Sequence, residues 1–288
     1  MAGSKQHRLG EYTDHHDDYL EDKVINLHVL EACNFRCSHC FAHFGGSKIS
    51  FKEWKSIVDN VMRGIQVKRF NIAGGEPLLY GDLDELANYI RSKGCEVSII
   101  TNGYGLSKQR TDALSECGIS MFGLSIDSPN ADTLRKVGRH TASGDILTPE
   151  MCLETCRHIR ERGMALKINT VVSQHNYTED FSHFIKEAVP SRWKIFKIKE
   201  FRKDRFDNSS LLISDAQFDN FVHRHGDIPH IPERTMAGTY IMIDASGNLI
   251  DTRSNNNTPV ANLLEANFGS VFSKLNFDHD TYNSRYAA

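Results

Sequence analysis

Cys33, Cys37 and Cys40 stand close together in the string CNFRCSHC, and their spacing constrains this chain more than any other feature. Three thiolates at i, i+4 and i+7 in a loop can ligate three irons of a four-iron four-sulfur cluster, which four cysteines would complete. Three cysteines leave one iron open to a small molecule. A zinc site with His39 or His43 as the fourth ligand is the alternative. Zinc ligands usually come as two separated pairs, however, and no second pair follows here.

The cysteine string follows a predicted strand, and strands then alternate with helices along the chain. Apolar periodicity predicts strands at 24–30, 69–73, 97–101, 121–125, 165–172 and 193–199, and helices at 51–66, 82–93, 107–117, 149–163 and 179–188. This alternation is typical of a parallel sheet with right-handed crossovers. Six units predict an α/β fold, a partial (β/α)6 barrel, with its chemistry at the carboxyl ends of the strands.

The remaining sequence predicts a tail and an extension on either side of this barrel. We expect a polar N-terminal tail at 1–21, the barrel at 22–200, and a C-terminal extension at 201–288 that closes the site. The extension contains a predicted helix at 214–224 and a hairpin around 239–248. The last dozen residues are expected to be weakly ordered.

Composition excludes several classes of function. The chain has 288 residues and a net charge of −3, which gives no general argument for a nucleic-acid or anionic-membrane partner. No stretch approaches the ~20 apolar residues of a membrane helix. Seven cysteines without a secretory signal argue against disulfides, so the cysteines outside the CNFRCSHC string are expected to be free thiols. We therefore expect a cytoplasmic protein.

Polar and glycine residues mark the ends of the predicted strands. Gly74-Gly75-Glu76-Pro77 follows the second strand, where two glycines allow close approach of the backbone to a ligand. Glu76 offers an acceptor for an ammonium group. Asn102, Ser125 and Asn169 end the third, fourth and fifth strands, where each is equally explained as a turn or capping residue.

Basic residues lie in or beside the apolar strands, where an unpaired charge is costly. Strand alternation directs Lys167 away from the side of Leu166 and Ile168, toward the barrel interior. Several cations at one opening of the barrel would suit the binding of a polyphosphate. The alternative is that each cation forms a separate ion pair with a nearby acid. The residues concerned are Arg69, Arg139, Lys167, Arg192 and Lys194.

The cysteine string and the Gly-Gly-Glu-Pro segment together resemble the signature of the radical S-adenosylmethionine (SAM) superfamily. The resemblance implies a [4Fe-4S] cluster on Cys33, Cys37 and Cys40, with SAM bound to the open iron. The Gly-Gly-Glu-Pro segment would hold the SAM amino group. The SAM-binding residues that the resemblance implies are Phe41, Gly74, Gly75, Glu76, Asn102, Ser125, Arg139 and Asn169.

Over residues 24–280 the chain is more specifically similar to the viperin family, especially its prokaryotic members. The segments that carry this similarity are Asn26-Leu27-His28, 71–77, Val137-Gly138-Arg139, Leu166-Lys167-Ile168-Asn169, 192–196 and 238–244. Membership implies that a deoxyadenosyl radical removes the 4′ hydrogen of a ribonucleoside triphosphate. Loss of the 3′ hydroxyl as water and addition of one electron and one proton follow. The 3′-deoxy-3′,4′-didehydro nucleotide terminates viral RNA chains.

The family's site residues map onto matching positions of this chain. Asn26 and His28 would line the nucleotide pocket, and Arg139 would bridge the SAM carboxylate and the phosphates. Tyr240, beside Thr239, would close over the ribose and supply a hydrogen atom or proton late in the cycle. Tyr240 and Lys167 are the expected catalytic residues. The expected substrate-binding residues are Asn26, His28, Arg69, Arg139, Lys167, Arg192, Lys194, Thr239 and Tyr240.

The sequence differs from those of the animal members of the family, and these differences limit which of their properties we expect in this chain. Position 69 is Arg where animal viperins have Lys, and the chain has neither their amphipathic N-terminal helix nor their terminal tryptophan. We therefore expect no membrane attachment. CTP is the favoured substrate, with UTP or GTP as alternatives, and a flavodoxin or ferredoxin is the expected reductant.

Two other functions stay open at the level of sequence. One is a different radical SAM reaction, such as GTP cyclisation or peptide modification, but those enzymes commonly carry further cysteines near the carboxyl end and none follows Cys156. The other is a non-catalytic binding protein stabilised by its metal.

Overall fold

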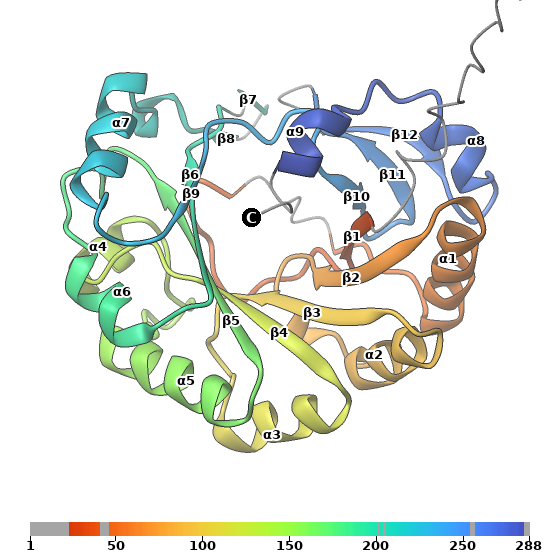
Figure 1. Ribbon diagram of the computed structural model, residues 1–288, viewed down its shortest axis with the longest axis horizontal. Helices are drawn as coiled ribbons and strands as arrows, with labels where there is room; N and C mark the ends of the chain where they lie inside the picture. The colour runs from red at the N-terminus through yellow and green to blue at the C-terminus, as the bar shows by residue number, and fades with distance from the viewer. Residues whose placement is uncertain (1–22, 41–45, 201, 204–205, 254–256, 285–288) are drawn as a thin grey trace, which may run out of the picture.

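The computed structural model describes residues 23–40, 46–200, 202–203, 206–253 and 257–284. A curved sheet forms the centre of the molecule (Figure 1). Its strands are β1 (Lys23–His28), β2 (Val67–Ala73), β3 (Glu96–Thr101), β4 (Ile119–Ser125), β5 (Ala165–Val172), β6 (Arg192–Lys197), β9 (Ile231–Glu233), β10 (Ile241–Ile243), β11 (Asn248–Asp251) and β12 (Thr258–Asn262). Strands β7 (Arg202–Lys203) and β8 (Phe206–Asp207) form a separate antiparallel pair.

The sheet is parallel through its centre. Its order is β12-β11-β10-β1-β2-β3-β4-β5-β6-β9, so that the first six strands are neighbours in chain order. Each of these pairs is parallel, and β9 and β10 extend the parallel pairing at either side. Strands β11 and β12 are antiparallel. The prediction of a partial barrel of six β/α units is confirmed.

Helices cover the outer side of the sheet (Figure 1). The helices that connect the central strands are α1 (Phe51–Gly64), α2 (Leu83–Ser92), α3 (Lys108–Glu116), α4 (Ala131–Lys136), α5 (Pro149–Glu161) and α6 (Ser182–Ala188). Helix α1 shows why the sequence folds this way. Trp54, Ile57 and Val58 are fully buried on one face, and Ser50 forms the capping box with Glu53 that fixes where the helix begins.

The carboxyl-terminal part adds α7 (Asp215–Arg224), α8 (Phe268–Phe272) and α9 (His279–Ser284), with short 3-10 turns at Pro77–Leu79 and Ser209–Leu211. The predicted helix at 214–224 and the hairpin around 239–248 are present as α7 and as β10 with β11. The predicted helix at 179–188 is shorter and begins at Ser182. The short elements α4, β9, β12, α8 and α9 were not foreseen from the sequence pattern.

The expectation that the last dozen residues are weakly ordered is wrong for the part that the structure describes, 277–284. Helix α9 brings Tyr282 against β1, where its hydroxyl accepts a hydrogen bond of 2.6 Å from the Val24 amide. The Lys23 ammonium lies 4.8 Å from the centre of the Tyr282 ring. An aromatic side chain with a polar partner therefore fastens this helix to the first strand.

Within these described ranges, none of the helices combines the length and the apolar character needed to span a membrane. The predicted polar tail at 1–21 lies outside the described residues.

Candidate functional site

A cavity of about 470 Å³ lies inside the curve of the sheet. Strands β1 to β6 and the segment around β9 and β10 contribute to its wall. Most of the residues singled out from the sequence line it: Asn26, His28, Cys33, Cys37, Cys40, Arg69, Gly74, Gly75, Glu76, Asn102, Ser125, Arg139, Lys167, Asn169, Arg192, Lys194 and Tyr240.

One expected residue that the structure describes is not part of this wall, and another lies outside the described residues. Thr239 is described and buried, but its hydroxyl donates to the Met236 carbonyl at 3.2 Å and the cavity lining does not include it. Its expected role in substrate binding stays a prediction. Phe41 lies outside the described residues.

The segment Gly74–Pro77, called here the glycine strap, packs directly on the chain that leads into the cysteines. Gly75 donates its amide to the Leu30 carbonyl at 2.7 Å, and Glu76 donates to the Ala32 carbonyl at 2.9 Å. A Cβ atom on Gly75 would lie 2.1 Å from the Ala32 oxygen. Gly74 has a φ of 145°, which side chains rarely permit. Both glycines are therefore required for the strap to reach the cysteine segment.

Glu76 is almost fully buried and organises the end of β3. Its carboxylate accepts hydrogen bonds from the Thr101 hydroxyl at 2.5 Å, the Asn102 amide at 2.8 Å and the Leu78 amide at 3.1 Å. Burial raises the pKa of Glu76, although these donors oppose the shift. A carboxylate offers about four lone-pair sites, so capacity remains for an ammonium group from the cavity.

The residues around the cysteines fit a bound cluster and SAM. The Phe35 amide donates to the Cys33 sulfur at 3.4 Å, a contact that favours the thiolate. Burial raises the pKa of the Cys37 thiol to about 12, and ligation to iron removes such a proton. The buried Oδ1 atom of Asn169, a residue of the cavity lining, has no hydrogen-bond partner in the part of the chain that the structure describes. A buried amide oxygen without a partner is costly, so this atom points to a ligand with a donor group.

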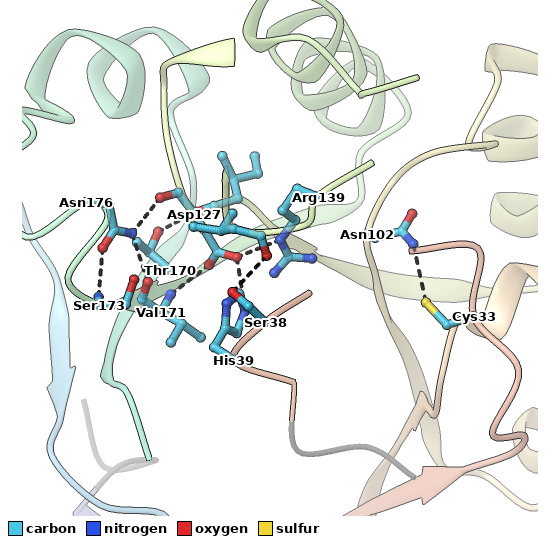
Figure 2. A network of polar contacts seen from close by, with 12 residues as sticks. Cys33, Ser38, His39, Asn102, Asp127, Arg139, Thr170, Val171, Ser173 and Asn176 are labelled. Carbon is cyan, nitrogen blue, oxygen red and sulfur yellow. Dashed lines mark hydrogen bonds and ion pairs between the residues drawn. The ribbon is translucent and has the colours of Figure 1, made fainter. Parts of the chain in front are cut away.

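A buried ion pair joins the cysteine segment to the carboxyl end of β4 (Figure 2). Asp127 is fully buried; the Nε atom of Arg139 donates to its Oδ2 at 2.6 Å, and the His39 Nε2 lies 3.2 Å from the same oxygen. The Val171 amide donates to Oδ1 at 2.8 Å. Burial alone would raise the pKa of Asp127, but Arg139 and His39 hold it well below its usual range. Asp127 is therefore a carboxylate that fixes the direction of Arg139.

The segment that leads to Arg139 wraps the cysteine string. Ser38 donates its amide to the Val137 carbonyl at 3.0 Å. A Cβ atom on Gly138 would lie 2.4 Å from the Arg36 oxygen, and Gly138 has a φ of 79°. The Val137-Gly138-Arg139 string thus places the arginine beside the cysteines by backbone contact.

Cations from β2, β5 and β6 also line the cavity. Lys167 alternates with buried Leu166 and Ile168 along β5 and faces the cavity, as the strand pattern predicts. Burial, followed by the charges of Lys194, Arg69 and Arg192, lowers the pKa of Lys167 to about 7, while Glu233 opposes this shift. These cations repel one another in the ligand-free protein. The arrangement therefore favours an anion of high charge.

The first strand presents neutral polar groups to the cavity. Asn26 donates to the Ile241 carbonyl at 3.0 Å and accepts from Asn71 at 2.7 Å, while Asn71 accepts from Ser98 at 2.8 Å. Burial lowers the pKa of His28 to about 4, with Asp244 opposing, so the imidazole is neutral at pH 7. The side chains of Asn26, Asn71 and Ser98 form a hydrogen-bonded row across β1, β2 and β3.

Sequence reasoning missed two acidic residues of the site. Asp127 follows β4 in Ile126-Asp127-Ser128, and an acid directly after a strand was the available signal. Glu233 stands on a three-residue strand that contains Pro232, so no periodicity marked it. The hydroxyl of Tyr240 donates to Glu233 at 2.6 Å, and the Lys194 ammonium donates to the other carboxylate oxygen.

Comparisons with known proteins identify the family of the chain. The model of the radical SAM superfamily matches residues 27–188. An S-adenosylmethionine-dependent nucleotide dehydratase from Selenomonas ruminantium is 36% identical over 269 residues, covering 91% of this chain and 98% of that protein. A protein of the same name from Psychrobacter lutiphocae is 30% identical, covering 92% of this chain and 95% of that protein.

Solved structures show the same architecture. The crystal structure of Streptococcus suis SuiB bound to its precursor peptide SuiA superimposes with a TM-score of 0.72 at 15% identity, over 93% of this chain and 67% of that chain. This is a likeness of fold. Taken with the sequence relatives and the arrangement of the cavity, it leads to one assignment. The chain belongs to the radical SAM superfamily and, within it, to the S-adenosylmethionine-dependent nucleotide dehydratases, the family of viperin.

Proposed function

We propose that the protein dehydrates a ribonucleoside triphosphate to its 3′-deoxy-3′,4′-didehydro analogue in antiviral defence. The observation that carries this proposal is that one cavity is lined by two chemically different sets of residues. The cysteines and the glycine strap form one set, and Arg69, Lys167, Arg192 and Lys194, which contribute positive charge, form the other. A radical generated at the first set can reach the sugar of a nucleotide whose phosphates contact the second.

The cluster and SAM, when bound, supply an electron and a 5′-deoxyadenosyl radical that takes a hydrogen atom. In our proposal Cys33, Cys37 and Cys40 hold the iron, and the glycine strap and Asn169 hold SAM. Arg139, fixed by Asp127, reaches toward both the SAM carboxylate and the phosphates. The contacts of each of these residues are compatible with the role proposed for it.

The nucleotide would lie between the row of neutral polar groups on β1 and the cations of β2, β5 and β6. Asn26 and His28 face its nucleoside part, and Tyr240 stands beside the ribose, so that the C-terminal segment at 201–288 closes the site. Lys167 has a pKa of about 7, which suits a group that gives a proton to the departing 3′ hydroxide near neutral pH. The overall change is loss of water after one hydrogen atom is removed, with one electron and one proton added.

The finer assignments form part of the same proposal. CTP is the favoured substrate, with UTP and GTP as alternatives, and a flavodoxin or ferredoxin supplies the electrons in the cytoplasm. No nucleic acid or membrane takes part.

The test is anaerobic. Reconstituted protein is incubated with SAM, dithionite and CTP, UTP, GTP or ATP separately, and products are analysed by mass spectrometry. A nucleotide lighter by one water, formed with 5′-deoxyadenosine, supports the proposal and identifies the base. Release of deoxyadenosine without a modified nucleotide would overturn the dehydration and favour a different radical SAM reaction.

A further inference from the structure

Glu233 is a buried carboxylate in the cavity wall to which the proposed reaction gives no role. It is 5% exposed. The Lys194 ammonium donates to its Oε1 atom, and the Tyr240 hydroxyl donates to its Oε2 atom at 2.6 Å. The Lys194 nitrogen also lies 3.3 Å from the Tyr240 oxygen. One acid therefore contacts two residues expected to bind the nucleotide.

These contacts join parts of the sheet that strand pairing does not join. Lys194 stands on β6, which pairs with β9, the strand of Glu233. Tyr240 directly precedes β10, which pairs with β1. Because β9 and β10 lie on different sides of the six central strands, the carboxylate of Glu233 contacts a lysine at one side of these strands and a tyrosine at the other.

The negative charge of Glu233 also partly balances the positive charges of the neighbouring cations. It opposes the lowering of the Lys167 pKa by Lys194, Arg69 and Arg192. A buried carboxylate requires such partners, and removing its charge leaves the cations around it less balanced. A more positive cavity attracts a triphosphate more strongly.

We propose that Glu233 is a positioning residue of the nucleotide site, which holds Lys194 and Tyr240 in a fixed relation and moderates the attraction of the cavity for the triphosphate. This inference rests on the proposed function. It separates two effects of one side chain: its charge weakens phosphate binding, and its hydrogen bond to Tyr240 favours turnover.

Glu233→Gln tests both effects because the amide keeps the size of the side chain. Its oxygen can still accept from Lys194, but its NH₂ group faces Tyr240, whose hydroxyl can then no longer donate there. We expect CTP and inorganic triphosphate to bind about threefold or more tightly. We expect kcat to fall at least about tenfold, because displacement of a group at the reacting sugar is costly.

The chain offers a matched control on its surface. Asp59 of α1 accepts a hydrogen bond from the Tyr89 hydroxyl at 2.7 Å, and the Lys93 ammonium lies 2.7 Å from its other oxygen. This is the same set of three groups, outside the cavity lining. Asp59→Asn is expected to leave triphosphate affinity and kcat unchanged.

The experiment uses the reconstituted, SAM-loaded full chain under anaerobic conditions. Calorimetry gives the Kd for CTP and for inorganic triphosphate, and product formation gives kcat. Tighter binding with slower turnover in Glu233→Gln, and a smaller fold-loss of kcat from Tyr240→Phe in that background than in the wild-type protein, support the proposal. Unchanged or weaker triphosphate binding, or a kcat equal to that of Asp59→Asn, would overturn it.

A second variant keeps the test decisive if Glu233→Gln does not retain its cluster. Glu233→Asp preserves the charge and shortens the reach, so that we expect unchanged triphosphate affinity with a reduced kcat. A kcat equal to that of the wild-type protein would contradict the positioning role. The triphosphate measurement needs no turnover, so failure of the wild-type protein to dehydrate any nucleotide would count against the proposed function and not against the charge effect of Glu233.

Discussion

The Nε2 atom of His39 lies 3.2 Å from the Oδ2 atom of Asp127. His39 stands between two of the cysteines in the sequence, and Asp127 follows β4, so this contact ties the cysteine segment to the barrel. Arg139 shares the same carboxylate oxygen (Figure 2). The position of the cysteines and the direction of Arg139 therefore depend on one buried acid.

Asp127→Asn is expected to destabilise the protein by on the order of 3 kcal/mol, because it leaves the largely buried Arg139 without a charged partner. Urea unfolding under anaerobic conditions measures the loss. Asp132→Asn, which removes an exposed partner 3.6 Å from Arg135, is the control and should change stability by less than about 0.5 kcal/mol. Equal stability of the two variants would contradict a structural role for the buried pair.

Gly75→Ala is expected to weaken SAM binding by about tenfold or more, since the new Cβ would lie 2.1 Å from the Ala32 oxygen and force the glycine strap away from the cysteines. Equilibrium dialysis with SAM measures the effect. Gly81→Ala is the matched control, because a Cβ there has no atom within 4 Å. If both variants bound SAM as the wild-type protein does, the close approach of the strap would not matter for binding.

Cys37→Ala is expected to abolish the cluster and all SAM cleavage, because two thiolates do not hold the site that three define. Iron and sulfide content and deoxyadenosine release measure the two losses. Cys117→Ala removes a thiol that contacts Asn88 outside the cavity and should keep both. A Cys37→Ala protein that still cleaved SAM would disprove the ligand assignment.

Triphosphate binding is expected to take up a proton near pH 8. The pKa of Lys167 is about 7 in the ligand-free protein, so the side chain is then mainly neutral, and a bound polyanion favours its charged form. CTP affinity should therefore fall as the pH rises from 7 to 9. Calorimetry in two buffers of different ionisation enthalpy measures the proton uptake. Lys167→Met should eliminate it, and equal uptake in this variant would assign the proton to another group.

The same pKa predicts how stability depends on pH. Lysine in the unfolded chain has a pKa near 10.5, above the folded value of about 7, so the unfolded state binds more protons between these values. The free energy of unfolding of the ligand-free protein should therefore rise with pH across this range. Urea unfolding at pH 7 and pH 9 checks the sign. The dependence should be smaller in Lys167→Met, and a fall with pH that is equal in both proteins would contradict the assignment.

The barrel could be predicted because its signals are local. Apolar periodicity within each strand and helix marked the six β/α units, and alternation along β5 correctly directed Lys167 inward. The cysteine spacing and the Gly74-Gly75 pair could also be recognised from neighbouring residues alone, without knowledge of contacts between distant parts of the chain.

The parts that escaped prediction depend on contacts between distant residues. Strand β9 has three residues and forms because β6 offers an unpaired edge, so no pattern marked Glu233. Helix α9 is short, and it is held by the hydrogen bond between Tyr282 and Val24, more than 250 residues earlier in the chain. The pairing of Asp127 with Arg139 and His39 likewise follows from the folded chain.

The order of the strands has a consequence for how the two sides of the barrel are held together. The barrel is not a complete ring: β9 ends one side, β10 stands beyond β1 on the other, and the two are not hydrogen-bonded neighbours. The chain between them, residues 234–240, is the covalent bridge over this gap (Figure 1). The length of that bridge limits how far β9 and β10 can separate, so an insertion there would loosen this restraint without altering any strand.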